Sequence, residues 1–394
     1  MYPLSPDLID FLVSPPARIA LEHLKESDLR DAEILDRLTE LRKRFPQDRA
    51  AALIDQARLR KKAAAKFPNA ERMLFDDEAL QQASSRAVAA YHAQHFAGYR
   101  RVGDLGCGIG ADMLALAEVI PEVIAIEIDP VRARLAELNA DACGLAHRVQ
   151  VLRADWTTLD LDIEAAFADP ARRVDGHRVF RLEDIIPPIA AILTLQTHTS
   201  NLAVKVAPGI DHADIPPQAE AEFISEQGEM KEALLRFGAL RTGAQTQATL
   251  LPGRHQLNSQ AAVTDITERK PGAFLYEPDP AILRAGLVRH LATQLGADQL
   301  DADIAYLTSD VLTTTPFARG WQVIRHGRFH LKTLNHWLRE LGAGSLVVKK
   351  RGSPIDPEEF RRRLKTTPGG PAMTVFLTHV QGQPWMIIGV PTQC

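Results

Sequence analysis

The sequence predicts an α/β protein whose central part is a doubly wound parallel sheet, with a helical region before it and an α+β region after it. Between about residues 100 and 250, short apolar runs alternate with stretches of helical character, which is the pattern of parallel strands joined by crossover helices. Before residue 75, apolar residues instead recur at helical spacing among charged residues. We therefore expect three domains, covering residues 1–75, 76–268 and 269–394.

The length and composition agree with this organisation. A chain of 394 residues is longer than one hydrophobic core usually supports. Its 45% hydrophobic and 24% charged residues are typical of a globular protein, and its net charge of -4 excludes a globally basic nucleic-acid binder. A local basic surface stays compatible with this total. From residue 311 onward, twelve Lys and Arg stand against four acids.

Metal and membrane sites are not predicted. The three cysteines are too scattered for a disulfide framework, and neither they nor the thirteen histidines have zinc-ligand spacing. The longest apolar stretch starts at Ile185, contains two prolines and is too short to span a bilayer. The N-terminal residues lack the basic start and long apolar core of a signal peptide. We expect a cytoplasmic protein.

The strongest motif is VGDLGCGIGAD, where the first strand of the sheet meets its helix. Gly106, Gly108 and Gly110 stand at alternate positions and allow the backbone to approach a ligand closely. They follow an acid, Asp104, at the carboxyl end of the strand, where such folds bind ligands. A dinucleotide site would place its third glycine where Ala111 stands. A tight turn with no ligand is the alternative, although a turn alone needs one glycine.

Acids also end the next two predicted strands. Glu127 follows Gly110 by seventeen residues, where such folds place a carboxylate that accepts hydrogen bonds from two ribose hydroxyls. Asp129 is an alternative for this role, but capping of the following helix explains it more simply. Asp155 ends the third strand, and an aspartate that only begins a turn is the alternative there.

The D-x-G-x-G-x-G loop with its following acids resembles class I S-adenosylmethionine-dependent methyltransferases. The resemblance implies a Rossmann-like fold and S-adenosylmethionine as cofactor. The loop that contains Cys107 would then hold the methionine end of the cofactor, with Asp104 serving its ammonium group. On the adenine side, Ile128 would line the pocket, Asp155 would accept from the adenine amino group, and Trp156 would border the ring.

The fourth strand ends in AAFADPARR. Methyltransferases that act on exocyclic amino groups carry an Asp, Asn or Ser here, followed by two prolines and an aromatic residue. This chain keeps the two hydrogen-bond acceptors at Asp169 and Pro170, while Ala171 and Arg172 replace the second proline and the ring. Arg172 could stack on a base or hold a phosphate. The alternative is a strand end with structural pairs between arginines and acids.

The flanking regions extend the resemblance over essentially the whole chain. The C-terminal part, with FLYEPDPAILRAG, PFARGWQVI and LVVKKRG, resembles the THUMP-like domain of bacterial methyltransferases that also have a helical N-terminal domain. The core is distantly similar to trimethylguanosine synthase. Before the core, Gln82, Ala83 and Ser84 could cover the methionine end of the cofactor, or belong to an amphipathic helix that packs on the sheet.

The resemblance implies an RNA substrate, because THUMP domains bind RNA. Lys349, Lys350 and Arg351 form a candidate phosphate-binding cluster. A second cluster comprises Arg361, Arg362, Arg363 and Lys365. In the second cluster, acids open a helix and bases close it, which the helix dipole also explains.

The leading hypothesis is a methyltransferase that modifies a base amino group in tRNA or rRNA. Two alternatives stay open. The acceptor could be a protein or a small molecule, or the chain could be an RNA-binding module with a vestigial cofactor site.

Overall fold

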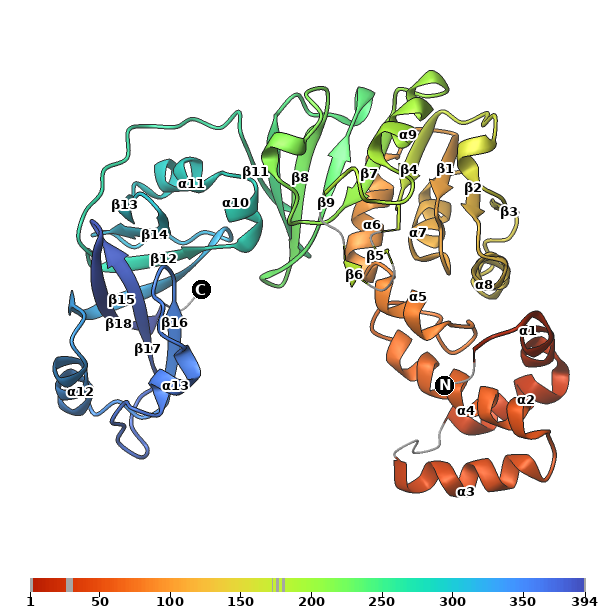
Figure 1. Ribbon diagram of the computed structural model, residues 1–394, viewed down its shortest axis with the longest axis horizontal. Helices are drawn as coiled ribbons and strands as arrows, with labels where there is room; N and C mark the ends of the chain where they lie inside the picture. The colour runs from red at the N-terminus through yellow and green to blue at the C-terminus, as the bar shows by residue number, and fades with distance from the viewer. Residues whose placement is uncertain (1–2, 26–30, 172, 175–176, 179–180, 393–394) are drawn as a thin grey trace. The chain divides into compact units, whose positions relative to one another are not determined.

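The computed structural model describes residues 3–25, 31–171, 173–174, 177–178 and 181–392 (Figure 1). The chain divides into two compact units. The first comprises residues 1–219 and 234–242, and the second comprises residues 220–233 and 243–394. The division of the chain into domains at residues 75 and 268 stays a prediction.

The first unit begins with the expected helices (Figure 1). They are α1 (Pro6–Val13), α2 (Pro15–Lys25), α3 (Asp31–Arg42) and α4 (Gln47–Ala63). The side chain of Ser5 caps α1 by accepting a hydrogen bond from the backbone N–H of Leu8. The longest of these helices, α4, packs against the other three and buries Leu53 and Ile54.

Two buried amide side chains join these helices to the sheet that follows. Gln56 on α4 donates to the carbonyl oxygen of Phe75 over 2.7 Å and accepts from its N–H over 3.0 Å. Asn139 makes the same pair of bonds with Leu74, at 3.1 and 2.9 Å, and also donates to Ile109. Both side chains bond buried backbone groups that water cannot reach, so they fix the path of the chain at Leu74 and Phe75.

A parallel sheet follows, as the apolar runs predict. Its strands lie in the order β7-β4-β1-β2-β3. They are β1 (Arg101–Leu105), β2 (Glu122–Glu127), β3 (Val149–Arg153), β4 (Ala165–Ala168) and β7 (Leu202–Val206). The helices of this region are α5 (Asp77–Gln82), α6 (Arg86–His95), α7 (Ala111–Val119), α8 (Pro130–Ala142) and α9 (Ile189–Leu193). The order reverses between β1 and β4, and α/β sheets of this kind bind their ligands at the carboxyl ends of the strands at such a reversal.

Several short elements complete the first unit. The apolar stretch that starts at Ile185 becomes helical only from α9 onward, because Pro187 and Pro188 keep the preceding residues out of the helix. The pair β5 (Arg173–Val174) and β6 (His177–Arg178) is antiparallel. Strand β9 (Glu229–Arg236) belongs to both units, and just after its end Phe237 donates to the carbonyl oxygen of Leu202 on β7.

The second unit starts with strands β8 (Glu220–Glu226) and β10 (Thr246–Leu251), which are parallel. Strand β10 also pairs with the antiparallel β11 (His255–Asn258). The short helix α10 (Pro280–Arg284) packs against β8 and β10, and its Arg284 lies 5.9 Å from the ring centroid of Phe223.

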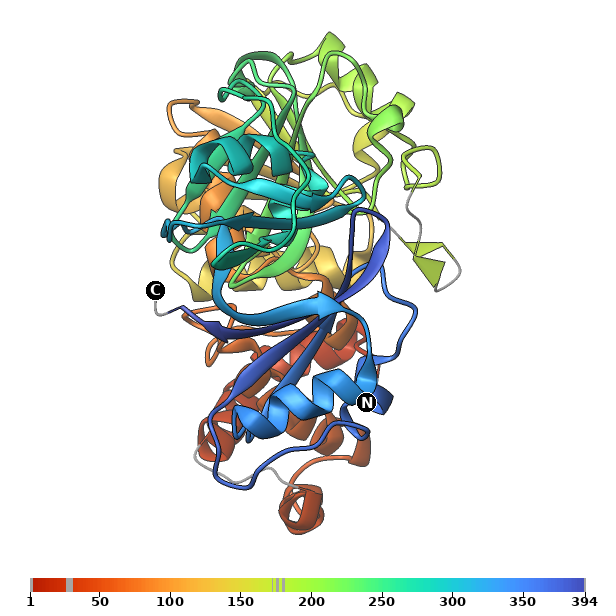
Figure 2. The ribbon, with the colours of Figure 1, turned by 90° about the vertical axis from the view of Figure 1, so that its left-hand side faces the viewer.

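The C-terminal sheet has the strand order β13-β14-β12-β15-β18-β17-β16, in which only β16 and β17 are parallel among the pairs of described residues. Its strands are β12 (Phe274–Pro278), β13 (Asp298–Asp301), β14 (Ile304–Ser309), β15 (Ala318–Arg328), β16 (Leu346–Lys350), β17 (Met373–Val380) and β18 (Gln383–Pro391). The helices here are α11 (Val288–Leu295), α12 (Leu331–Glu340) and α13 (Pro357–Arg361). In Figure 2 the long blue strands of this sheet run beside α12.

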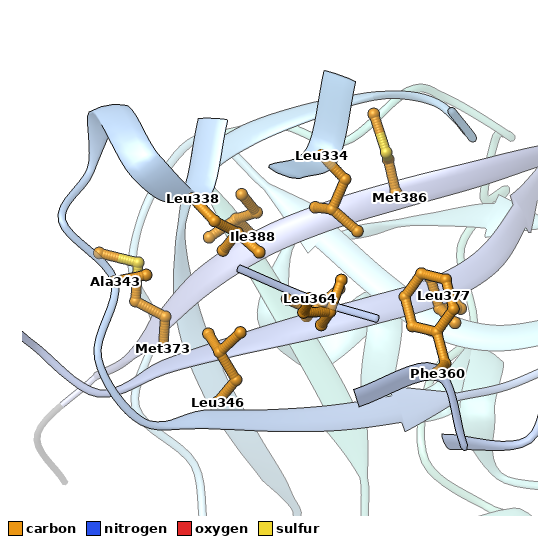
Figure 3. Close-up of a cluster of buried hydrophobic side chains, with 11 residues drawn as sticks. Leu334, Leu338, Ala343, Leu346, Phe360, Leu364, Met373, Leu377, Met386 and Ile388 are labelled. Atoms are coloured by element: carbon orange, nitrogen blue, oxygen red, sulfur yellow. The ribbon is translucent and has the colours of Figure 1, made fainter. Parts of the chain in front are cut away.

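Both faces of the C-terminal sheet are buried, because alternate residues of its strands enter different cores. On β17, Val375 and Leu377 join Leu334 and Leu338 of α12 in one core (Figure 3). Phe376, between them in sequence, packs on the other face with its ring centroid 5.0 Å from that of Trp321 and 5.5 Å from that of Tyr306. The sheet therefore separates two cores rather than one core and solvent.

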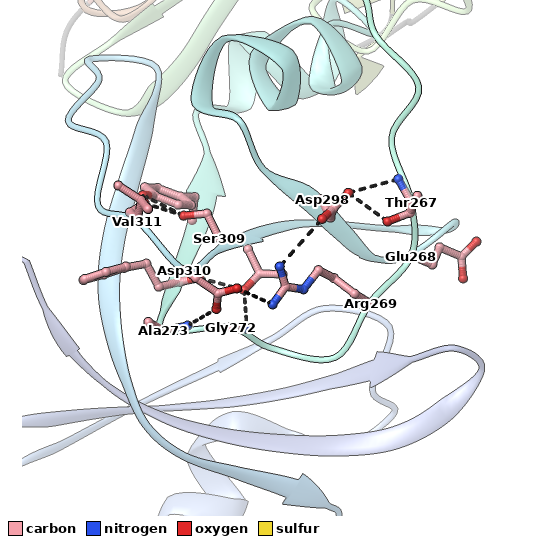
Figure 4. Close-up of polar contacts among 12 residues, drawn as sticks. Thr267, Glu268, Arg269, Gly272, Ala273, Asp298, Ser309, Asp310 and Val311 are labelled. Atoms are coloured by element: carbon pink, nitrogen blue, oxygen red, sulfur yellow. Dashed lines mark hydrogen bonds and ion pairs between the residues drawn. The ribbon is translucent and has the colours of Figure 1, made fainter.

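The polar segment before β12, residues 264–272, is held against the C-terminal sheet (Figure 4). Arg269 pairs with Asp310 at 2.8 Å and with Asp298 at 3.8 Å, and Asp298 accepts two hydrogen bonds from Thr267. The backbone of the same segment bonds Gln299 on β13. The residues just before β12 thus line the edge of the C-terminal sheet.

No helix within the described ranges is long and apolar enough to cross a membrane.

Candidate active site

The glycine loop joins β1 to α7. Gly106, Gly108 and Gly110 have φ values of +85°, +56° and +95°, which residues with a Cβ rarely adopt. At Gly106 a Cβ would stand 2.8 Å from the carbonyl oxygen of Asp169, so the ends of β1 and β4 approach each other through this glycine. At Gly108 a Cβ would meet nothing within 4 Å, which leaves open space on that side of the loop. Burial raises the pKa of the Cys107 thiol well above its usual value, which disfavours its thiolate form.

Asp104 is the most unusual residue of the site. Its side chain is 1% exposed, and neither carboxylate oxygen has a hydrogen-bond partner among the residues that the structure describes. Burial, followed by repulsion from Asp112 and Asp169, raises the pKa of Asp104 well above its usual value. Because unpaired buried charges are costly, this carboxylate suits a cationic group from a ligand.

Glu127 ties the glycine loop to the start of α8. One of its oxygens accepts from the backbone N–H of Gly108 and the other from that of Asp129, both over 2.9 Å. The side chain is 8% exposed. Each oxygen keeps a lone pair, so the fixed carboxylate can still accept from two neighbouring hydroxyls.

Among the neighbouring candidate residues, the two aspartates cap helical turns, and the two hydrophobic residues differ in exposure. Asp129 caps α8 by accepting from Val131 and Arg132, which confirms the simpler of its two interpretations. Asp155 is exposed and begins the short 3₁₀ turn Trp156–Thr158, where it accepts twice from Thr157. Trp156 is buried, whereas Ile128 is 66% exposed.

Asp169 lies directly beside the glycine loop. Its backbone N–H donates to the carbonyl oxygen of Leu105 over 3.0 Å. Its carboxylate Oδ2 is 2.8 Å from Nζ of Lys205, so a lysine rather than an arginine pairs with it. Pro170 is buried, and Ala171 pairs by two backbone hydrogen bonds with residue 186. Arg172 lies outside the described residues.

Sequence reasoning missed a buried polar network behind Asp169. Lys205 on β7 is 2% exposed and also donates to Ser84 over 3.1 Å. Ser84 donates to one oxygen of Asp112, whose other oxygen is 2.8 Å from Nδ1 of His92. A charged residue within the apolar run LAVKV was the available signal, because a lysine on a buried strand needs a partner.

Of residues 82–84, Gln82 ends one helix, and Ala83 and Ser84 lie between that helix and the next. Helix α5 ends at Gln82, and α6 begins at Arg86 after the cap at Ser85. The pKa of Asp112, the partner of Ser84, reflects opposing effects. Burial is the largest single effect and raises the pKa. The hydrogen bond and charge of His92, together with the charge of Lys205, outweigh burial, so the pKa falls below its usual value. Asp112 is therefore an ionised anchor for this segment.

The two basic clusters of the C-terminal domain differ. In the first, Lys349 pairs with Glu277 and lies 5.0 Å from the ring centroid of Trp321, and Arg351 lies 5.2 Å from that of Tyr306. Lys350 alone of that cluster is exposed. The members of the second cluster, Arg361, Arg362, Arg363 and Lys365, are all exposed. The acids of that segment cap and open α13, as its sequence predicts.

Three sequence-family models match parts of the chain. One described as RNA cap guanine-N2 methyltransferase matches residues 99–204, and one described as THUMP domain-like matches residues 318–391. A domain of unknown function matches residues 5–63.

Full-length relatives extend this likeness. Two uncharacterized S-adenosylmethionine-dependent methyltransferases of Mycobacterium tuberculosis, from strains CDC 1551 and H37Rv, are each 35% identical over 350 residues. The matches cover 86% of this chain and 95% of each relative. A crystal structure from Porphyromonas gingivalis W83, provisionally assigned as a methyltransferase, covers both chains fully with a TM-score of 0.78 and 21% identity. At that identity the structural match shows the shared fold.

The buried carboxylate of Asp104 predicts a pH-dependent stability. Its raised folded-state pKa means that its protonated form contributes stability at low pH, which is lost as pH rises through that pKa. Asp104→Asn cannot ionise, so its melting temperature should exceed that of the wild type by a margin that grows as pH rises above about 4, the ordinary pKa of an aspartate in the unfolded chain. Thermal unfolding followed by circular dichroism without ligand measures this. The exposed Asp141→Asn is the control, and a margin independent of pH contradicts the assignment.

Proposed function

The chain belongs to the family of S-adenosylmethionine-dependent methyltransferases, and from this premise we propose that it methylates an exocyclic amino group of an RNA base. The cofactor supplies, when bound, a methyl group already activated by its sulfonium. The protein must then hold the cofactor, orient the amino group toward the methyl carbon and accept a proton. Each of these tasks has candidate residues at the carboxyl ends of the strands.

The residues around the glycine loop fit the cofactor. Asp104 would bind the ammonium group, which gives its buried carboxylate the partner that it lacks among the described residues. The turn of Gly106–Gly110, with Cys107 inside it, would follow the methionine end. Glu127 would bind the ribose hydroxyls through its remaining lone pairs.

The adenine end is less enclosed. Ile128 offers an exposed apolar side chain. Asp155 and the neighbouring Trp156 would border the ring, with Asp155 using the carboxylate oxygen that Thr157 does not occupy.

One observation carries the choice of acceptor. Asp169 and Pro170 directly follow β4, at the point where the chain abuts Gly106. An amino group held by their oxygens would therefore lie next to the part of the glycine loop that would hold the methionine end of the cofactor. An amino nitrogen conjugated to a ring is a weak nucleophile, because its lone pair is delocalised. Two acceptors that fix its N–H groups favour the geometry in which the lone pair points at the methyl carbon. Asp169 then accepts the departing proton as charge develops.

RNA as the acceptor is supported by the guanine-N2 methyltransferase likeness of residues 99–204 and by the THUMP-like match of residues 318–391. The exposed charges of Lys350 and of the second basic cluster, Arg361 to Lys365, would contact phosphates. Lys349 and Arg351 would contribute less, because they already pair within the domain.

The ribose assignment predicts a selective loss of cofactor affinity. In Glu127→Gln an amide nitrogen would face one of the two backbone N–H donors, so the group can no longer accept at both oxygens. Affinity for S-adenosylmethionine should fall by about 1.5–3 kcal/mol, measured by isothermal titration calorimetry. Asp129→Asn keeps the helix cap and should bind within about twofold of wild type. Equal losses in both variants would transfer the role away from Glu127.

The acceptor assignment is tested in cells. We expect a methylated nucleoside to disappear from total RNA when the gene is deleted, to return with the wild-type gene, and to stay absent with Asp169→Ala. Nucleoside mass spectrometry gives this readout. Purified Asp169→Ala should still bind S-adenosylmethionine within about tenfold of wild type, because the residue acts on the acceptor.

Two results would argue against this assignment. An unchanged nucleoside profile in the deletion strain points to a protein or small-molecule acceptor, or to a chain without catalytic activity. If the Asp169→Ala gene restores the missing nucleoside, Asp169 is not needed for the reaction.

A further inference from the structure

The ion pair between Lys205 and Asp169 joins a buried group to an accessible one. The Lys205 side chain is 3% exposed, and that of Asp169 is 27% exposed. Lys205 occupies only Oδ2 of the carboxylate, at 2.8 Å, and Oδ1 accepts no hydrogen bond from any described residue. One oxygen of the carboxylate is thus fixed by the buried lysine, and the other is available to a substrate.

Lys205 is itself held in place. Its ammonium donates to Ser84, and Ser84 donates to Asp112, which is anchored by His92 on α6. These residues come from different elements: α6, α7, β7 and the turn before α6. The position of the ammonium is therefore set by the packing of the sheet and its helices, rather than by a flexible side chain.

Stability alone does not account for this arrangement. A buried ion pair often contributes little, and replacing it with apolar residues of similar volume can leave a fold as stable or more so. The neighbours of Lys205 along β7, Val204 and Val206, are fully buried and apolar, so the lysine is a charged exception on this strand. A lysine there fits a role at the carboxylate that it contacts.

We propose that Lys205 is a positioning residue that holds Asp169 with Oδ1 facing the acceptor amino group. This inference rests on the proposed function of Asp169. As the nitrogen–carbon bond forms and the carbon–sulfur bond breaks, the amino proton passes to Oδ1 of Asp169 and from there to water. Lys205 keeps its own proton throughout and fixes the direction from which Asp169 meets the acceptor.

The test compares charge removal with charge retention. Lys205→Met keeps the length of the side chain without its charge, and Lys205→Arg keeps the charge. The half-buried Lys231 on β9, changed to Met, controls for loss of a lysine elsewhere. Tritium-labelled S-adenosylmethionine and total RNA from cells that lack the gene give kcat and KM, and calorimetry gives cofactor affinity.

For Lys205→Met we expect kcat to fall by about a hundredfold, the usual scale for a misplaced catalytic group, with cofactor affinity within about threefold. The kcat of Lys205→Arg should exceed that of Lys205→Met by at least about tenfold. Lys231→Met should match wild type. Wild-type kcat in Lys205→Met, or a loss of cofactor affinity as large as the loss of kcat, would overturn the proposal.

A readout that does not use RNA separates the two proposals. In a crystal structure of Lys205→Met, the Asp169 side chain should leave the orientation that it has beside β7. If wild type methylates no RNA and Asp169 still turns away in this variant, the RNA proposal fails and the positioning role stands. An Asp169 side chain that keeps its orientation without Lys205 overturns the positioning role.

Discussion

A carboxylate buried without a hydrogen-bond partner among the described residues lies at the centre of the candidate site. Asp104 ends the first strand of the sheet, and burial denies it the water that would stabilise its charge. A fold keeps such a group only at a cost to its own stability. The cost is understandable at the carboxyl end of β1, where the glycine loop leaves room for a ligand, because a bound ammonium group converts the same carboxylate into a strong, specific contact.

The other acids around the loop show what Asp104 lacks. Glu127 accepts from two backbone N–H groups, Asp112 is held by a histidine and a serine, and Asp169 pairs with Lys205. Each partnership also fixes the position of its carboxylate, which in the proposed function leaves Glu127 to bind hydroxyls and Asp169 to meet the acceptor. Asp104 differs from these acids because neither of its oxygens has a hydrogen-bond partner among the described residues. In the proposed function, cofactor binding and acceptor alignment are divided between carboxylates on adjacent strand ends.

The sequence predicts this sheet and the places of its strand-end acids well, because short apolar runs and a glycine loop are local signals. Contacts between distant segments were not predictable in the same way. Lys205 and Ser84 lie 121 residues apart, and no local pattern joins them. Likewise, Lys349 and Arg351 lie in a basic run, yet the C-terminal sheet turns them onto Trp321 and its neighbours. The sequence shows that a segment is basic, whereas only the fold shows which way its charged side chains point.

The central claim is that the Asp104 carboxylate binds the ammonium group of the cofactor. Calorimetric titration of S-adenosylmethionine into wild type and Asp104→Asn tests it most directly. We expect the variant to bind about tenfold to a hundredfold more weakly, the effect of losing a charged hydrogen bond. Wild-type affinity should also rise with pH until the cofactor's own amino group titrates near about pH 8, and the variant should lose that dependence. Equal affinity of the two proteins across this range would contradict the account.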